Sequence, residues 1–165
     1  MSDNGFKYLL THEQSLIVAM HLLKAGIDYP YSIAKINGIE IGEVEALLEE
    51  LMRMGLVEKK GSSSIKRSDD AFKRSHEVHK HHTYYGLTRL GEITIREVKK
   101  RALLCAEKIR YSRLGKDIER GSFLMPSEKE ELKKMGILYE SNGSFGLTVF
   151  GEMVRWYITE GDKNN

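Results

Sequence analysis

The chain has 165 residues, of which 41% are hydrophobic and 30% charged, a composition typical of a globular protein with a core of its own. Its apolar runs, such as residues 15–20, are far shorter than the roughly 20 residues that a membrane span requires, and no signal peptide is recognisable. The single cysteine, Cys105, excludes an internal disulfide and a cysteine-based zinc site. We therefore expect a cytoplasmic protein without membrane contacts.

The first third of the chain predicts two helices in close succession. Thr11 and Gln14 have the spacing of a capping box, so the first helix is expected over residues 11–26, ending at a glycine. After a turn, Ser32 is expected to cap a short second helix over residues 33–36.

A third helix and two strands are expected to follow. The helix is predicted over residues 41–54, with Ile41 among its inward-facing apolar positions. Strands are predicted over residues 56–58 and 83–87, and Thr88 then caps a further helix. The order helix, helix, helix, strand, loop, strand is that of a winged helix-turn-helix. The fold class expected is therefore mainly α with small β wings (α+β).

The same residues carry a family resemblance. SIAKINGIEIGEVEALLEELMRMGLVEKK (residues 32–60) resembles the helix-turn-helix and first wing strand of MarR-like, PadR-like and ArsR-like regulators. HHTYYGLTRLGE (residues 81–92) resembles their second wing strand and next helix, and the chain also resembles uncharacterised archaeal winged-helix proteins. The resemblance implies a winged helix-turn-helix domain over residues 8–92 that binds double-stranded DNA, regulates transcription and is not an enzyme.

The C-terminal half contains a second copy of two short motifs. ELMRMGL (residues 50–56) has a counterpart in ELKKMGI (131–137), and GLTRLGE (86–92) has one in GLTVFGE (146–152), with five of seven residues identical. We expect a second, truncated winged-helix-like unit over residues 121–160.

Ser127 and Glu130 are expected to form a capping box in this second unit, and residues 141–144 a tight hairpin turn. A long helix over residues 88–113 is expected to link the two units. Its apolar stripe either pairs with a second copy in a homodimer or packs on the second unit. The residues of the stripe are Ile95, Val98, Ala102, Cys105, Ala106 and Ile109.

Basic residues are concentrated in the middle of the chain. The net charge is only +2, but residues 59–98 carry 9 Lys/Arg against 5 Asp/Glu, and residues 99–120 carry 8 against 3. This distribution favours an anionic partner, although a solvated basic loop remains the alternative for the long wing over residues 59–83. The candidate DNA-binding residues are Ser32, Lys35, Lys59, Lys60, Lys66, Arg67, Lys73, Arg74, Lys80, His81 and Arg89.

The third helix departs from the pattern of a DNA-binding helix because it is acidic. Glu43, Glu45 and Glu49 lie where side chains would meet the major groove, and carboxylates repel phosphates. The alternative function is therefore a protein-interaction module that uses this acidic helix as its contact face.

A third alternative is a metal-responsive regulator. His76, His79 and His81 are weak candidate ligands, because imidazole binds transition metals but no cysteine lies nearby. No phosphate-binding glycine loop or nucleophile elbow is present, and no cofactor is expected.

Overall fold

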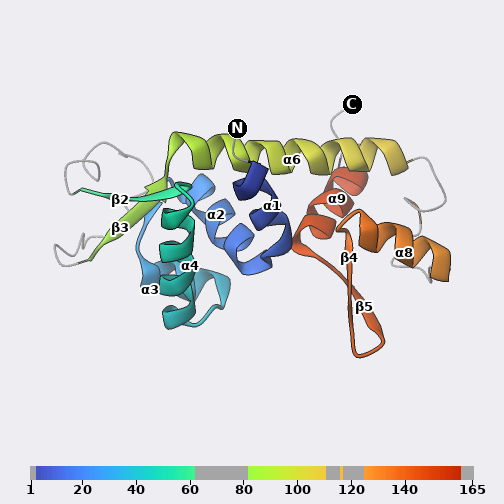
Figure 1. Cartoon of the computed structure of the whole chain (residues 1–165), viewed down its shortest axis with the longest axis horizontal. Coiled ribbons are helices and arrows are strands. Elements are labelled where there is room, and N and C mark those ends of the chain that lie inside the picture. Colours follow the sequence, from blue (N-terminus) through green and yellow to red (C-terminus); the bar gives the residue numbers. More distant parts are fainter. Residues whose placement is uncertain (1–2, 62–81, 111–115, 117–124, 161–165) are drawn as a thin grey trace. The chain divides into compact units, whose positions relative to one another are not determined.

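The computed structural model describes residues 3–61, 82–110, 116 and 125–160, and over these ranges the chain is mainly helical with two small antiparallel sheets (Figure 1). This agrees with the α+β class expected from the sequence. The chain divides into two compact units, residues 1–5 with 14–95 and residues 6–13 with 96–165. The elements are α1 (Asp3–Thr11), α2 (Glu13–Ala25), β1 (Ile27–Asp28), α3 (Pro30–Asn37), α4 (Ile41–Arg53), β2 (Val57–Lys60), β3 (Tyr84–Leu87), α6 (Arg89–Ile109), α8 (Pro126–Lys134), β4 (Leu138–Ser141), β5 (Ser144–Leu147) and α9 (Val149–Glu160).

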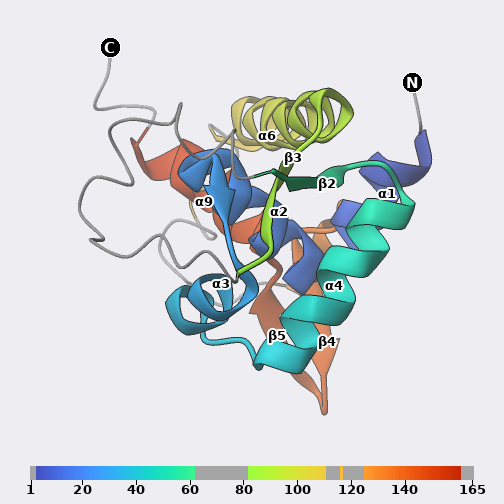
Figure 2. The same ribbon diagram turned by 90° about the vertical axis from the view of Figure 1, so that its left-hand side faces the viewer.

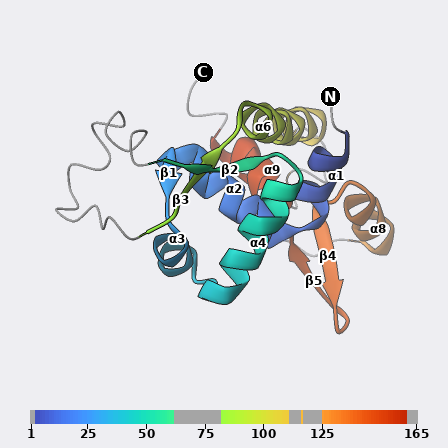
Figure 3. The ribbon, with the colours of Figure 1, turned by 60° about the vertical axis from the view of Figure 1, so that its left-hand side comes forward.

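The first unit packs α2, α3 and α4 against a three-stranded sheet. The strands lie in the order β1-β3-β2, all antiparallel, with Ile27 opposite Gly86 and Val57 opposite Leu87 (Figure 3). One apolar face of each helix points into a common core, which explains why α4 buries a residue every three or four positions. The core includes Leu16, Leu22, Ile33, Val44, Leu48, Leu51, Leu56 and Tyr84.

The second unit contains residues 6–11 of α1, the part of α6 from Arg96 onward, α8, the β4–β5 hairpin and α9. Asn142 and Gly143 both have positive φ, as a two-residue hairpin turn requires, which confirms the turn predicted at residues 141–144. The side chain of Glu13 caps α9, since its Oε1 accepts from the Val149 amide at 3.0 Å. The core of this unit includes Leu9, Val98, Ala102, Leu132, Ile137, Phe150, Val154 and Ile158.

The predicted third helix, both strands around the wing and the long helix are confirmed as α4, β2, β3 and α6. Gly55 ends α4 with a φ of 72°, a conformation that favours glycine. Thr88 caps α6, because its hydroxyl oxygen accepts from the Gly91 amide at 3.0 Å.

The structure corrects three predicted helix starts. Thr11 lies at the end of α1, a helix that the sequence analysis missed, and its hydroxyl lies 3.0 Å from the Lys7 carbonyl, so no capping box forms with Gln14. The second helix, α3, begins three residues earlier than expected because Pro30 occupies its first turn.

The third correction concerns α8. This helix begins at Pro126, and the Glu128 side chain accepts from the Met125 amide at 2.7 Å. Ser127 is therefore already inside the helix, and the predicted box of Ser127 with Glu130 is wrong.

The apolar stripe of α6 is buried within the single chain. Val98, Ala102, Ala106 and Ile109 are between 0% and 6% exposed, and Cys105 is half-buried. This stripe therefore offers almost no surface to a second copy. Over the described ranges no helix is both long and apolar enough to cross a bilayer.

Candidate nucleic-acid interface

Helices α3 and α4 are joined by a three-residue turn and pack against each other (Figure 2). Gly38 ends α3 with a φ of 66°, and the Ile39 amide donates back to the Ala34 carbonyl at 3.1 Å. The Val44 amide then donates to the Glu40 carbonyl at 3.0 Å, which begins α4. The turn is compact because a glycine adopts the left-handed conformation without steric cost.

A buried carboxylate fixes the start of α3. Asp28 is 8% exposed and accepts three hydrogen bonds, from the Tyr29 amide (2.9 Å), the Ser32 hydroxyl (2.8 Å) and His21 Nε2 (2.8 Å). These bonds join α2, β1 and α3 at one point. Because three donors converge on it, the carboxylate is well satisfied despite its burial.

The opposite nitrogen of the same imidazole contacts the end of α3. Asn37 Nδ2 lies 3.2 Å from His21 Nδ1 and 2.7 Å from the Ile33 carbonyl. An amide nitrogen can only donate, so Nδ1 accepts and Nε2 carries the proton that bonds Asp28. The Ser32 hydroxyl is directed at Asp28 and not at the imidazole, so these groups do not form a nucleophile and base. Their effect is to hold both ends of α3 in place.

The start of strand β3 is anchored by aromatic rings. Tyr29, which precedes α3, stacks on His82 with ring centroids 4.7 Å apart, and Tyr84 meets Tyr29 edge-on at 5.6 Å. Burial, with the nearby Tyr29 and Asp28, raises the pKa of Tyr84. The returning strand β3 is therefore tied directly to the start of α3.

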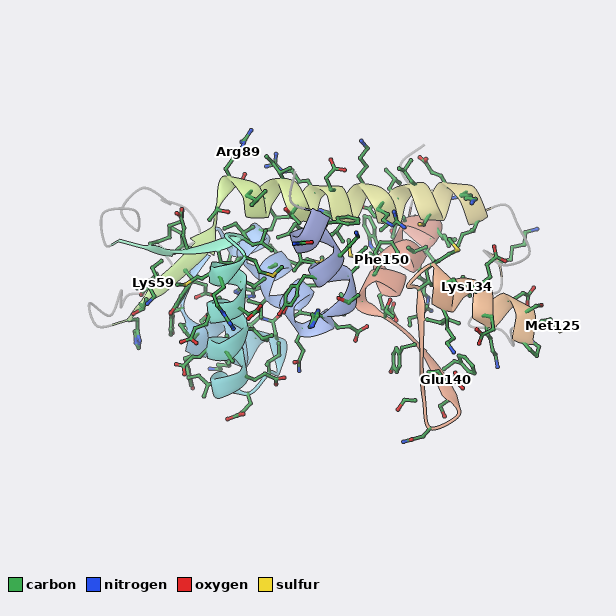
Figure 4. All side chains as sticks on the ribbon, viewed as in Figure 1. Lys59, Arg89, Met125, Lys134, Glu140 and Phe150 are labelled. Atoms are coloured by element: carbon green, nitrogen blue, oxygen red, sulfur yellow. The ribbon has the colours of Figure 1, made fainter. Side chains whose placement is uncertain are left out.

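The described basic candidates come from three different elements. Lys35 on α3, Lys59 on β2 and Arg89 at the start of α6 are exposed, and Figure 4 labels the last two. Lys60 forms an ion pair with Glu58. The Ser32 hydroxyl donates to Asp28, so Ser32 belongs to the buried network that holds the start of α3.

The remaining basic and histidine candidates lie outside the described residues. They are Lys66, Arg67, Lys73, Arg74, Lys80 and His81 for DNA, and His76, His79 and His81 for a metal. Among the residues that the structure describes, no three His, Cys, Asp or Glu side chains gather as a metal site would require.

The surface of α4 is acidic, as the sequence indicated. Glu45 and Glu49 are exposed, whereas Glu50 forms an ion pair with Arg53. The field of Glu45 and Glu49 reaches strand β3, because both carboxylates add to burial in raising the pKa of Tyr85. These two negative charges disfavour a phosphate close to Tyr85.

Exposed apolar side chains around the α3–α4 turn were not predicted. Tyr31 is 55% exposed, Ile36 66% and Ile41 43%, so the expectation that Ile41 faces inward is wrong. Ile41 is the first residue of α4 and lies beyond the edge of the core that Val44 and Leu48 enter. A helical-wheel projection of α4 places Ile41 on the same side as Val44 and Leu48, so its exposure follows from its position at the end of the helix and was not visible in the sequence pattern.

Residues 6–98 match the model of one protein family, DUF2250, described as an uncharacterized protein conserved in archaea. The match spans more than half of the chain, which therefore belongs to this family. It takes in the elements from α1 into α6 and ends before α8 and the second hairpin. Neither the curated proteins nor the solved structures contain a match to the chain.

Proposed function

We propose that the first unit is a winged helix-turn-helix and that the protein binds double-stranded DNA as a transcriptional regulator. One observation carries the proposal: the α3–α4 pair runs through Gly55 directly into the antiparallel β2–β3 hairpin, whose exposed Lys59 leads into a basic connecting segment. Helix, turn, helix and wing in this order suit the grooves and backbone of a duplex. The α8–β4–β5–α9 segment is, by the same proposal, a truncated winged-helix-like unit.

The charges of the described surface suggest how DNA is bound. Carboxylates along α4 leave base readout by this helix unfavourable, because phosphates flank every groove. Lys59 and Arg89, together with the lysines and arginines of residues 61–83, supply phosphate contacts instead. Binding of this kind is dominated by counterion release and shows limited sequence preference.

The experiment is a fluorescence-anisotropy titration with a mixed-sequence duplex at about 50 mM and about 200 mM salt. The affinity is expected to fall steeply with salt. A five-site variant replaces the basic residues with glutamine at Lys59, Lys66, Arg67, Lys73 and Arg74. The plot of log K against log salt is expected to become less steep by about 0.9 for each lost phosphate contact.

The control is Lys134→Gln, an exposed lysine at the end of α8 in the other unit (Figure 4). It should bind with the parental slope. A five-site variant that binds DNA with the parental affinity and slope would refute the wing as the phosphate contact, and no binding by the parent at low salt would refute the function.

A further inference from the structure

Helix α4 carries an exposed stripe of one apolar and two acidic side chains. Ile41, Glu45 and Glu49 follow one another at intervals of four residues, which places them along one side of the helix. All three are exposed, and Ile36, 66% exposed, precedes them on the last turn of α3. We call Ile41, Glu45 and Glu49 the acidic stripe.

A second exposed stripe, of opposite charge, lies on α6 within the other unit. Lys100, Leu104 and Lys108 have the same spacing of four residues, and all are exposed. Leu103 beside them is 36% exposed and Leu104 is 54% exposed. We call Lys100, Leu104 and Lys108 the basic stripe.

The surroundings of the two stripes reinforce their charges. Residues 41–53 of α4 carry four Glu against one Arg, and that Arg is paired with Glu50. Residues 96–108 of α6 carry five Lys/Arg against two Glu. Each stripe therefore combines an apolar side chain with a field of one sign, and the two fields are opposite.

We propose that the acidic stripe of one copy docks on the basic stripe of a second copy. Exposed leucine and isoleucine side chains lose water when they touch. When Ile41 meets Leu104, Glu45 lies one helical turn from the contact, as does a lysine on either side of Leu104, and the remaining charges add to the attraction between the two opposite fields. All six side chains are exposed in a single copy, so neither stripe is covered by the residues that the structure describes.

The contact is heterologous, since two different surfaces meet. Each copy keeps one free stripe of each kind, so association continues into rings or open chains unless the rotation closes at two copies. This use of α4 also accounts for a helix-turn-helix whose second helix is acidic. It does not depend on the proposed DNA binding and is tested without DNA.

The test is sedimentation velocity of the full-length protein over a range of concentrations at low and high salt. The parent is expected to associate with rising concentration, and less so at high salt, because screening weakens exposed charge pairs. Glu45→Lys/Glu49→Lys and Lys100→Glu/Lys108→Glu should each sediment as a monomer, since both stripes then carry the same sign.

Mixing the two charge-reversed variants in equal amounts provides the decisive measurement. Each variant then offers the stripe that complements the other, so association should return in the mixture alone. Ile41→Ser and Leu104→Ser should each weaken the parental association at least several-fold, whereas Met125→Ser, at the exposed apolar residue that precedes α8, should not. Circular dichroism checks that every variant keeps its helices.

A parent that stays monomeric at every concentration and salt overturns the proposal, because a partner of another kind would then have to cover the stripes. The proposal is also overturned if both charge-reversed variants still associate as the parent does. The same holds if the mixture fails to associate although both variants are folded.

Discussion

The hydroxyl of Thr88 donates a hydrogen bond to the carbonyl of Gly55 at 2.6 Å, across 33 residues of sequence. The end of α4 and the start of α6 are thereby joined at the base of the β2–β3 hairpin. Thr148 makes the same bond to Gly136 at 2.6 Å in the other unit, at the base of the β4–β5 hairpin. The motif repeated in the sequence is therefore one structural junction used twice.

This junction predicts the effect of removing the threonine hydroxyl. Thr88→Val loses the bond to Gly55 and the cap on the Gly91 amide, and is expected to lower the free energy of unfolding by about 1–2 kcal/mol. Thr88→Ser keeps the hydroxyl and should lose less than half of that. Urea unfolding measures both, and equal losses would mean that the methyl group matters as much as the hydroxyl, which contradicts the prediction.

The glycine three residues after each threonine permits a close backbone contact. A Cβ at Gly91 would lie 2.0 Å from the Leu56 carbonyl oxygen, and one at Gly151 would lie 2.1 Å from that of Ile137. Backbone atoms cannot yield by this amount, so Gly91→Ala is expected to cost about 3 kcal/mol or more of unfolding free energy.

Gly42→Ala on α4 is the matched control. Its Cβ would meet only the flexible Glu40 side chain, at 3.5 Å, so the usual helix preference for alanine should stabilise the protein by about 1 kcal/mol. Thermal unfolding of the two variants should therefore shift in opposite directions. A Gly91→Ala protein as stable as the parent would contradict the close contact.

The buried Asp28 network predicts a graded series of losses. Asp28→Ala leaves three donors without their acceptor and is expected to cost about 3 kcal/mol, whereas Ser32→Ala removes one bond and should cost about 1 kcal/mol. Hydrogen exchange should quicken across α3 in the Asp28 variant. Glu50→Ala, which breaks a surface ion pair with Arg53, should stay within about 0.5 kcal/mol of the parent. Equal stability of all three variants would argue against the network.

The parts of this fold that the sequence predicted are those governed by local rules. Gly55 ends α4 and Thr88 begins α6 because a left-handed glycine and a capping hydroxyl act within one turn of their helices. The start of α3 escaped prediction because Ser32 bonds Asp28, which is buried only when β1 joins β3. Strand β1 has two residues and no pattern of its own.

The same distinction between local rules and tertiary contacts applies to the candidate site. The charges of Lys59, Arg89 and the α4 glutamates are properties of the sequence and needed no structure. Which apolar residues remain exposed depends on tertiary packing, so Ile36, Ile41 and Leu104 became visible as surface only in the folded chain.

The pKa of Tyr85 offers a direct measure of the acidic surface on α4. Burial raises this pKa first, and the negative charges of Glu45 and Glu49 raise it further. Glu45→Gln/Glu49→Gln removes the second cause, so the pKa should fall but stay above its ordinary value of about 10. Tyr84 is the internal control, because its pKa is raised by burial, Tyr29 and Asp28, and it should not move.

The same shift fixes the sign of a stability change at high pH. A pKa raised in the folded protein means that the unfolded chain loses its phenolic proton first, at a pH of about 10. The stability linked to Tyr85 is therefore complete below that pH and declines as the pH rises toward the folded pKa. In the double variant the decline should be smaller, since the folded and unfolded pKa values lie closer together. Carbon-13 NMR of ring-labelled tyrosine, with urea unfolding on both sides of this range, measures both effects. An unchanged Tyr85 pKa in the double variant would show that the α4 carboxylates do not act on strand β3.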